Sequence, residues 1–231
     1  MAQPENPETI ILKNRYYPRG LREIDVWNHY QKVKRKLLLE TKNLDLMIVL
    51  MVDVNKPVMR RKLGSQNIRL TPQNYDEIIT GRTLSIHNSM SSISTYGIID
   101  VDIDPRDNFK WAIKATSDTY DFVMDKMPIV KKASIRFTGK SSFHIVCDFE
   151  RRMKVDTMKY LIERFLLQSD LARVYQVSGK RKSGVPNLDL DRNCLRCNHI
   201  ALHALSILGL QCMEVSYNNL QRFNPREAIV K

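Results

Sequence analysis

The spacing of hydrophobic and polar residues predicts alternating helices and strands along the chain. Apolar positions three or four residues apart predict helices at 21–39, 109–127 and 156–172. A Thr-Pro pair predicts the start of a short helix at 71–79. Near-continuous apolar runs predict strands at 44–54, 97–104 and 188–190, and a strand, a turn and a second strand at 133–149. Residues 58–64 are basic and turn-like, and residues 82–92 are extended or looped.

The order of these elements indicates an α+β protein. From residue 97 onward the chain runs strand, helix, two strands, helix and strand, which is the order of a split β-α-β sheet. The earlier elements predict an N-terminal α/β subdomain over residues 1–95, and residues 96–231 carry the split sheet. Because no repeat, low-complexity tract or clear linker interrupts the sequence, we expect one domain spanning residues 1–231.

The composition indicates a protein with a hydrophobic core and without a membrane span. Apolar residues make up 43% of the chain, which is enough for a core, and no apolar run approaches the length of a membrane span. The polar start resembles neither a signal peptide nor a transit peptide. Without an export signal, the four cysteines are expected to be reduced thiols in a cytoplasmic protein.

The charge balance favours a polyanionic partner. Lys and Arg number 37 against 25 Asp and Glu, which gives a net charge of +12. Cationic side chains bind nucleic acid by neutralising phosphates, so this surplus favours nucleic acid. A basic soluble protein with no such partner is the alternative.

Three acids alternate with apolar residues in YGIIDVDIDP. Residues two apart in a strand share a face, so Asp100, Asp102 and Asp104 are predicted to point the same way. Carboxylates crowded on one face repel each other unless a cation neutralises them, and hard oxygen ligands suit Mg²⁺ or Mn²⁺. The alternative is an edge strand with solvated acids, but the apolar neighbours favour burial of the other face. Further acids follow in LDLDRN, at Asp189 and Asp191.

The stretch TGKSS, residues 138–142, is not a phosphate-binding loop of the ATPase type. That loop needs a Gly where Ser134 stands, and a helix must follow, whereas FHIVCDF predicts a strand. A turn containing Lys140, Ser141 and Ser142 can still donate hydrogen bonds to a triphosphate. His144 shares the face of Ser142 and can reach the same phosphates, or it is a satisfied core histidine.

Six segments in a fixed order carry a family resemblance. They are YYPRGLREIDVWNHY, LSIHNS, DIDPRDNFKW, TGKSSFHIV, SGVPNLDLDRN and LQRFNPREAIV. In this order the chain resembles the archaeo-eukaryotic primase superfamily. It is most similar to the primase-polymerase domain of ligase D-type end-joining DNA ligases and its stand-alone relatives. The resemblance covers most of the chain, and it places His87 at the family's histidine, Trp111 at its Trp and Asp189 at its late acid.

The resemblance implies an RRM-like split β-α-β catalytic sheet of the primase-polymerase type, with an N-terminal α/β subdomain. It implies a template-directed nucleotidyltransferase, a DNA primase or polymerase. Such an enzyme adds NTPs or dNTPs to nucleic-acid 3′ ends in DNA repair or replication priming, by catalysis with two Mg²⁺ or Mn²⁺ ions. The implied partners are a DNA template and primer, nucleoside triphosphates and a separate DNA ligase or other repair and replication proteins, in the nucleoid and not at a membrane.

The resemblance also implies roles for individual residues. Motif spacing places the metal-binding acid pair at Asp102 and Asp104, whereas the apolar pattern places it at Asp100 and Asp102, so Asp102 belongs to both. Asp189 is the third acid. The nucleotide-binding set is Thr138, Gly139, Lys140, Ser141, Ser142 and His144, with His87 nearby. The residues expected at the nucleic acid are Arg60, Arg61, Lys180, Arg181 and Lys182.

Two departures from the family pattern favour a rival function. The family's nucleotide-contacting Lys has no clear counterpart, although Arg60, Arg61 or Lys62 are candidates. Leu205 stands where a late Arg is expected, with Arg196, His199 or His203 as candidates to compensate for it. The rival is a catalytically inactive relative that only binds nucleic acid.

A zinc-dependent module is a further rival. Cys194, Cys197, His199 and His203 supply zinc-type ligands. Their spacing is too compact for the usual finger, so structural zinc is not expected. Cys147 and Cys212 are expected to be core thiols.

Overall fold

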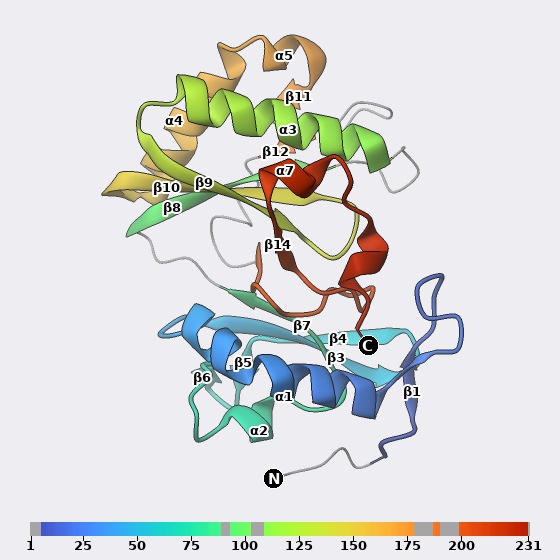
Figure 1. Cartoon of the computed structure of the whole chain (residues 1–231). Helices are drawn as coiled ribbons and strands as arrows, with labels where there is room; N and C mark the ends of the chain where they lie inside the picture. Colours follow the sequence, from blue (N-terminus) through green and yellow to red (C-terminus); the bar gives the residue numbers. More distant parts are fainter. Residues whose placement is uncertain (1–5, 89–92, 103–108, 178–186, 190–198, 231) are drawn as a thin grey trace. The chain divides into compact units, whose positions relative to one another are not determined.

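The computed structural model separates into two compact units, and each has a sheet of its own (Figure 1). It describes residues 6–88, 93–102, 109–177, 187–189 and 199–230, and for 187–189 the backbone alone. The first unit comprises Met1–Ser89, Cys197–Met213 and Asn224–Lys231, and the second comprises Met90–Arg196 and Glu214–Phe223. The sequence grouped all residues after 95 together, whereas two later segments return to the first unit. Backbone bonds such as Ala201 N–H to the Ile86 carbonyl, 2.8 Å, hold the return in place.

The first unit is built on a four-stranded antiparallel sheet. Its strand order is β13 (His199–Ile200), β7 (Thr83–Asn88), β3 (Leu46–Asp53) and β4 (Lys56–Arg60). The helices are α1 (Glu23–Glu40), α2 (Tyr75–Ile78) and the 3₁₀ turn η1 (Pro225–Ala228). Two short ribbons complete the unit, β1 (Ile10–Leu12) with β2 (Leu21–Arg22), and β5 (Lys62–Leu63) with β6 (Gln66–Asn67).

Helix α1 buries one stripe against this sheet. Val26, Tyr30, Val33 and Leu37 recur at helical spacing and join β3 and β7 in one core cluster. The Tyr30 hydroxyl donates to the Leu84 carbonyl at 2.7 Å and accepts from the Leu205 N–H at 3.1 Å. One buried hydroxyl therefore ties α1 both to β7 and to the segment that returns late in the chain.

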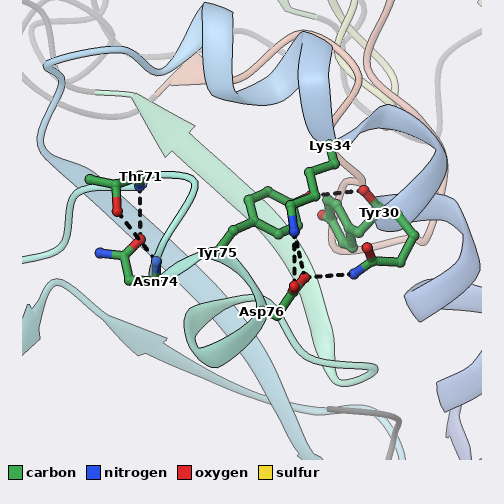
Figure 2. Close-up of polar contacts among 7 residues, drawn as sticks. Tyr30, Lys34, Thr71, Asn74, Tyr75 and Asp76 are labelled. Atoms are coloured by element: carbon green, nitrogen blue, oxygen red, sulfur yellow. Dashed lines mark hydrogen bonds and ion pairs between the residues drawn. The ribbon is translucent and has the colours of Figure 1, made fainter. Parts of the chain in front are cut away.

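Two local predictions for the first unit are wrong. Helix α2 begins at Tyr75 rather than near Thr71, because Thr71 and Asn74 bond each other's backbone N–H groups and hold a turn there (Figure 2). The basic stretch from 58 to 63 is mostly extended rather than turn-like, and the turn comes at Gly64. Pairing with β3 makes Lys56–Arg60 a strand, since Leu50 stands opposite Val58 and Ile48 opposite Arg60.

The second unit is built on a six-stranded sheet. Its strand order is β11 (Gln176–Val177), β12 (Asn187–Asp189), β8 (Ile93–Asp102), β10 (Phe143–Lys154), β9 (Val130–Phe137) and β14 (Met213–Val215). Its helices are α3 (Phe109–Lys126), α4 (Val155–Leu167), α5 (Leu171–Val174) and α7 (Tyr217–Leu220). The split β-α-β order predicted from the sequence is therefore present as β8, α3, β9, β10, α4 and β12.

Helices α3 and α4 cover the same face of this sheet (Figure 1). Ile99 and Val101 of β8 and Ile145 of β10 join both helices in one core cluster. Gly97 lets α4 approach closely, because a Cβ there would lie 2.6 Å from the Met158 sulfur. Since side chains alternate along a strand, the residues between these apolar positions point to the other face.

An aromatic cluster fixes the first turn of α3. Phe109 lies 5.5 Å from Phe143 and 6.1 Å from Phe137 between ring centroids, and Phe223 lies 4.9 Å from Phe137. Phe109 is the first residue of α3, so the cluster anchors the end of the connection that follows the acids of β8.

Candidate functional site

The acids of β8 lie on the sheet face that α3 and α4 leave uncovered. Asp100 and Asp102 alternate with Ile99 and Val101, whose side chains are fully buried on the helical side. Asp100 retains only 16% exposure of its side chain. The predicted strand with a shared acid face is present as far as Asp102, the last described residue before position 109. Asp104 lies outside the described residues.

Strand register aligns four charged or titratable residues in one row across the sheet. Asp189 of β12 stands opposite Asp100, Asp100 opposite His144 of β10, and His144 opposite Arg136 of β9. Directly opposed residues of antiparallel strands share a face, and neighbouring strands are about 4.8 Å apart. We call Asp189, Asp100, His144 and Arg136 the cross-strand row. It runs from two acid positions through an imidazole to a guanidinium.

His144 is buried within this row. Its Nε2 lies 3.7 Å from Asp100 Oδ1, and its side chain is 7% exposed. Ile98 and Val146, on the same face, form a small apolar cluster beside it. An imidazole held next to a carboxylate in such surroundings is oriented and shielded from solvent, which agrees both with a satisfied core histidine and with a phosphate-binding one.

The turn between β9 and β10 is closed by its own side chains. The Thr138 hydroxyl donates to the Ser142 carbonyl at 3.0 Å, and the two hydroxyl oxygens lie 2.9 Å apart. Gly139 adopts φ +78°, which favours glycine, and Lys140 is exposed. The stretch is thus a strand-to-strand turn and not an ATPase loop. Thr138 and Ser142 are buried and bonded to each other, whereas Lys140 and the half-buried Ser141 face outward.

Arg136 is a member of the row that sequence reasoning missed. It lies on β9, two residues before Thr138 at the start of the turn. The alternation of ASIRFT would have placed Ser134, Arg136 and Thr138 on one face. Nothing in the strand alone shows that this is the face of His144, because only the pairing of β9 with β10 decides it.

The remaining predicted residues lie elsewhere. His87 belongs to β7 of the first unit, where its Nε2 lies 3.0 Å from the Ser85 hydroxyl. Arg60 and Arg61 are exposed at and after the end of β4 in the same unit. Lys180, Arg181 and Lys182 lie outside the described residues. Leu205, at the position of the expected Arg, is fully buried in the core of the first unit.

The carboxylates on this face of the sheet suit a hard divalent cation. Asp100 and Asp102 offer carboxylate oxygens from one partly buried face, and the register puts position 189 beside Asp100. Among the side chains that the structure describes, no three His, Cys, Asp or Glu groups lie close enough to hold an ion. The described acids therefore fit part of a metal site, and Asp189 is placed by its backbone alone.

Cys147, Cys212 and His199 are core residues, whereas His203 is half-buried. Cys147 and Cys212 are buried thiols, as expected, and burial raises the pKa of Cys147 to about 12. His199 is 2% exposed within β13. Cys194 and Cys197 lie outside the described residues, so the zinc alternative stays untested.

Comparison with known proteins places the fold. Neither family models nor curated proteins match the sequence. Among solved structures, the chain is similar to the polymerase domain from Mycobacterium tuberculosis Ligase D in complex with DNA. The TM-score is 0.77 at 12% sequence identity, over 97% of this chain and 89% of that one. The chain has the mixed α/β fold, with antiparallel sheets, of that primase-polymerase domain, which confirms the predicted fold class and, at the level of fold, the resemblance seen in the six segments. None of the helices in the described part of the chain is long and apolar enough to cross a membrane.

Proposed function

We propose that the chain is a template-directed nucleotidyltransferase of the primase-polymerase type, which adds NTPs or dNTPs to nucleic-acid 3′ ends. The observation that carries this proposal is the cross-strand row on the face of the second unit's sheet opposite α3 and α4. Two acids of β8 share that face with the position of Asp189, next to a buried His144 and to Arg136. The same overall fold occurs in a DNA polymerase domain.

In this proposal the acids hold the metal ions. Asp100, Asp102 and Asp189 would ligate two divalent ions, Mg²⁺ or Mn²⁺. When bound, such ions lower the pKa of a primer 3′-hydroxyl and stabilise the charge on departing pyrophosphate. The register favours Asp100 over Asp104 as the partner of Asp102, because Asp100 stands between Asp189 and His144.

The other half of the row would bind the triphosphate. His144 and Arg136 lie one and two strands beyond Asp100, so phosphates held at the acids would extend over them. Lys140 at the turn adds a second cation, and Ser141 adds a donor. The family pattern has an Arg at the position of Leu205, which here is a buried core residue. In this proposal Arg136 supplies the guanidinium instead. A planar guanidinium suits phosphate oxygens because it donates two parallel hydrogen bonds.

DNA is the proposed second substrate. The net charge of +12 favours a polyanion, and the similar polymerase domain was solved with DNA. Arg60 and Arg61 present two exposed cations at the edge of the first unit's sheet, next to the exposed Met59. We assign them to backbone phosphates, which position a duplex without reading its sequence.

Primer extension on a recessed DNA end, with Mn²⁺ or Mg²⁺ and labelled nucleotides, tests the proposal. Asp102→Ala is expected to abolish extension, because it removes a metal ligand, while the thermal unfolding midpoint stays close to that of the wild type. Asp148→Ala is the matched control. Asp148 is an exposed acid on the same face of β10, four residues beyond His144, and its loss should leave extension unchanged.

The same assay separates the enzyme from the inactive relative. If the wild type extends the primer and Asp102→Ala does not, the result supports catalysis by this chain. DNA binding without extension under any nucleotide or metal would favour the binding-only relative. Full extension by a folded Asp102→Ala variant would exclude Asp102 as a metal ligand and with it the proposed catalytic role of the acids of β8.

A further inference from the structure

The first unit carries a groove that the proposed polymerase chemistry does not use. The groove has a volume of about 620 Å³ and lies between one face of α1 and the segment that leads into α2. Volumes of this size are typical of ligand sites. Its apolar floor and walls come from Leu38, Leu39, Leu70 and Pro72. Leu39 is 68% exposed, so the groove presents apolar surface to solvent.

Cations surround this apolar surface. Lys32, Lys34, Arg35 and Lys42 line the groove, and none of the described residues that line it is acidic. Lys34 is held by Asp76, with its Nζ 2.8 Å from Oδ2, which leaves Lys32, Arg35 and Lys42 to face an occupant. These three residues are exposed, one turn or two apart on α1 or just after it.

Contacts beside the groove hold α1 and α2, the helices next to it, against each other. Figure 2 shows Tyr30, Lys34, Tyr75 and Asp76 gathered between α1 and α2. The Tyr75 hydroxyl donates to the Tyr30 carbonyl at 2.8 Å, and Lys34 Nζ lies 4.7 Å from the centre of the Tyr75 ring. Hydrogen bonds from Lys34 and Gln31 hold the pKa of Asp76 below its usual value, so the ion pair persists at neutral pH. A preformed groove loses little conformational entropy on binding.

We propose that this groove docks an acidic peptide segment that carries apolar side chains. The apolar floor would bury one or two such side chains, and Lys32, Arg35 and Lys42 would face carboxylates on either side of them. Nucleic acid fits less well. Single strands bind through stacking on aromatic rings, and no aromatic side chain lines this groove among the described residues. The partner is therefore a protein with an acidic, amphipathic segment, and this inference does not depend on the polymerase proposal.

Fluorescence anisotropy with a short labelled peptide tests the inference. The probe has Asp and Glu around a central Leu-Phe pair, and it is titrated with the full chain. We expect saturable binding that weakens about tenfold in Arg35→Glu and in Lys42→Glu, because each reverses one facing charge. Leu39→Ser, which changes an exposed side chain, is expected to weaken binding by a similar factor.

Matched controls distinguish peptide binding in the groove from non-specific attraction of an acidic peptide to a basic protein. Lys36→Glu makes the same charge change on the same helix, but Lys36 does not line the groove, so binding should stay within about twofold of the wild type. A second peptide with Ala in place of Leu-Phe should bind weakly.

Three results would overturn the inference. They are failure of the wild type to bind the acidic peptide, equal loss in Lys36→Glu and Arg35→Glu, and loss of single-stranded DNA binding in Arg35→Glu and Lys42→Glu with peptide binding intact. The last result would make the groove part of a nucleic-acid path.

Discussion

His144 links the two halves of the cross-strand row at the level of single side chains. Its ring lies 3.7 Å from Asp100 on one side, and its register partner on the other side is Arg136. In the proposed site, a group in this position would contact both the acids and a phosphate held beside them. We expect its loss to affect nucleotide affinity more than DNA affinity.

Replacement of Arg136 tests the cationic end of the row. Arg136→Ala is expected to raise the KM for nucleoside triphosphate about ten- to a hundredfold, since charge-assisted hydrogen bonds contribute about 1.5–3 kcal/mol. Arg136→Lys should recover part of the affinity, because the charge stays while the two-pronged geometry is lost. Extension kinetics and binding of a fluorescent nucleotide measure both effects.

Arg152→Ala provides the control for this substitution. Arg152 is an exposed cation on β10 away from the row, so its removal should leave the KM unchanged. An unaltered KM and an unaltered nucleotide affinity in Arg136→Ala, with extension intact, would exclude Arg136 from the triphosphate site while leaving the polymerase proposal standing.

His29 makes the stability of the first unit depend on pH. Burial lowers its pKa to about 4, and its Nε2 lies 2.9 Å from the His203 carbonyl, to which the neutral ring donates. The unfolded chain takes up this proton below about pH 6.5, whereas the folded chain resists it until about pH 4. Stability is therefore complete above the unfolded pKa and declines as the pH falls through this window.

The expected loss at His29 is about 2 kcal/mol between about pH 7 and about pH 5. Urea unfolding at both pH values measures it. His29→Gln keeps a donor for the His203 carbonyl and has no titration, so its stability should change less over the same interval. Equal pH dependence in the two proteins would contradict the role of His29.

The contact of α4 with β8 shows how elements position the acids. Gly97 lies three residues before Asp100, and α4 crosses the strand at this point, with Met158, Ile162 and Phe149 within 3.3 Å of where a Cβ would lie. Absence of a side chain therefore lets the helix cover the face opposite the acids. The position of β8, and with it the acid face, depends on this close approach.

Gly97→Val is expected to destabilise the protein by about 1–3 kcal/mol, because overpacking forces α4 or β8 to shift. Thr95→Val is the comparison. Thr95 is exposed on the same strand, and the change should stay within about 0.5 kcal/mol. Denaturant unfolding measures the free energy of unfolding of both variants. Equal values for Gly97→Val and Thr95→Val would show that α4 moves aside without loss of stability.

The distribution of charge matters at the scale of the whole molecule. A surplus of 12 positive charges predicts DNA affinity that falls steeply with salt, because each phosphate contact releases a condensed cation. Exposed cations that touch phosphates contribute to this dependence, while those elsewhere contribute little.

The double substitution Arg60→Ala and Arg61→Ala is expected to reduce the slope of log affinity against log salt by about 2 for duplex DNA. Lys131→Ala with Lys132→Ala removes the same charge from exposed positions on β9 and should leave the slope nearly unchanged. Filter binding or anisotropy across a salt series measures the slopes. Identical slopes in both double variants would place the DNA away from Arg60 and Arg61.

The amino-acid sequence determined the local part of this protein. Alternation in β8, the apolar spacing of α3 and α4 and the turn between β9 and β10 were predictable, because each depends on residues close in sequence. Asp100 and Asp102 share a face for the same reason. Local reasoning failed at Thr71, where side-chain bonds to the backbone delay the helix, and at 58–60, where pairing with β3 extends the chain.

Only the tertiary structure decided which faces meet. A period of two fixes the face of a side chain within its own strand, but not the neighbour that stands opposite. The pairing of β12, β8, β10 and β9 is what puts Asp189, Asp100, His144 and Arg136 in one row. The return of residues 197–213 to the first unit is likewise a matter of distant contacts, such as Tyr30 with Leu205. Burial of apolar surface against residues far away in the chain selects these pairings, and a local sequence pattern does not predict which distant residues those are.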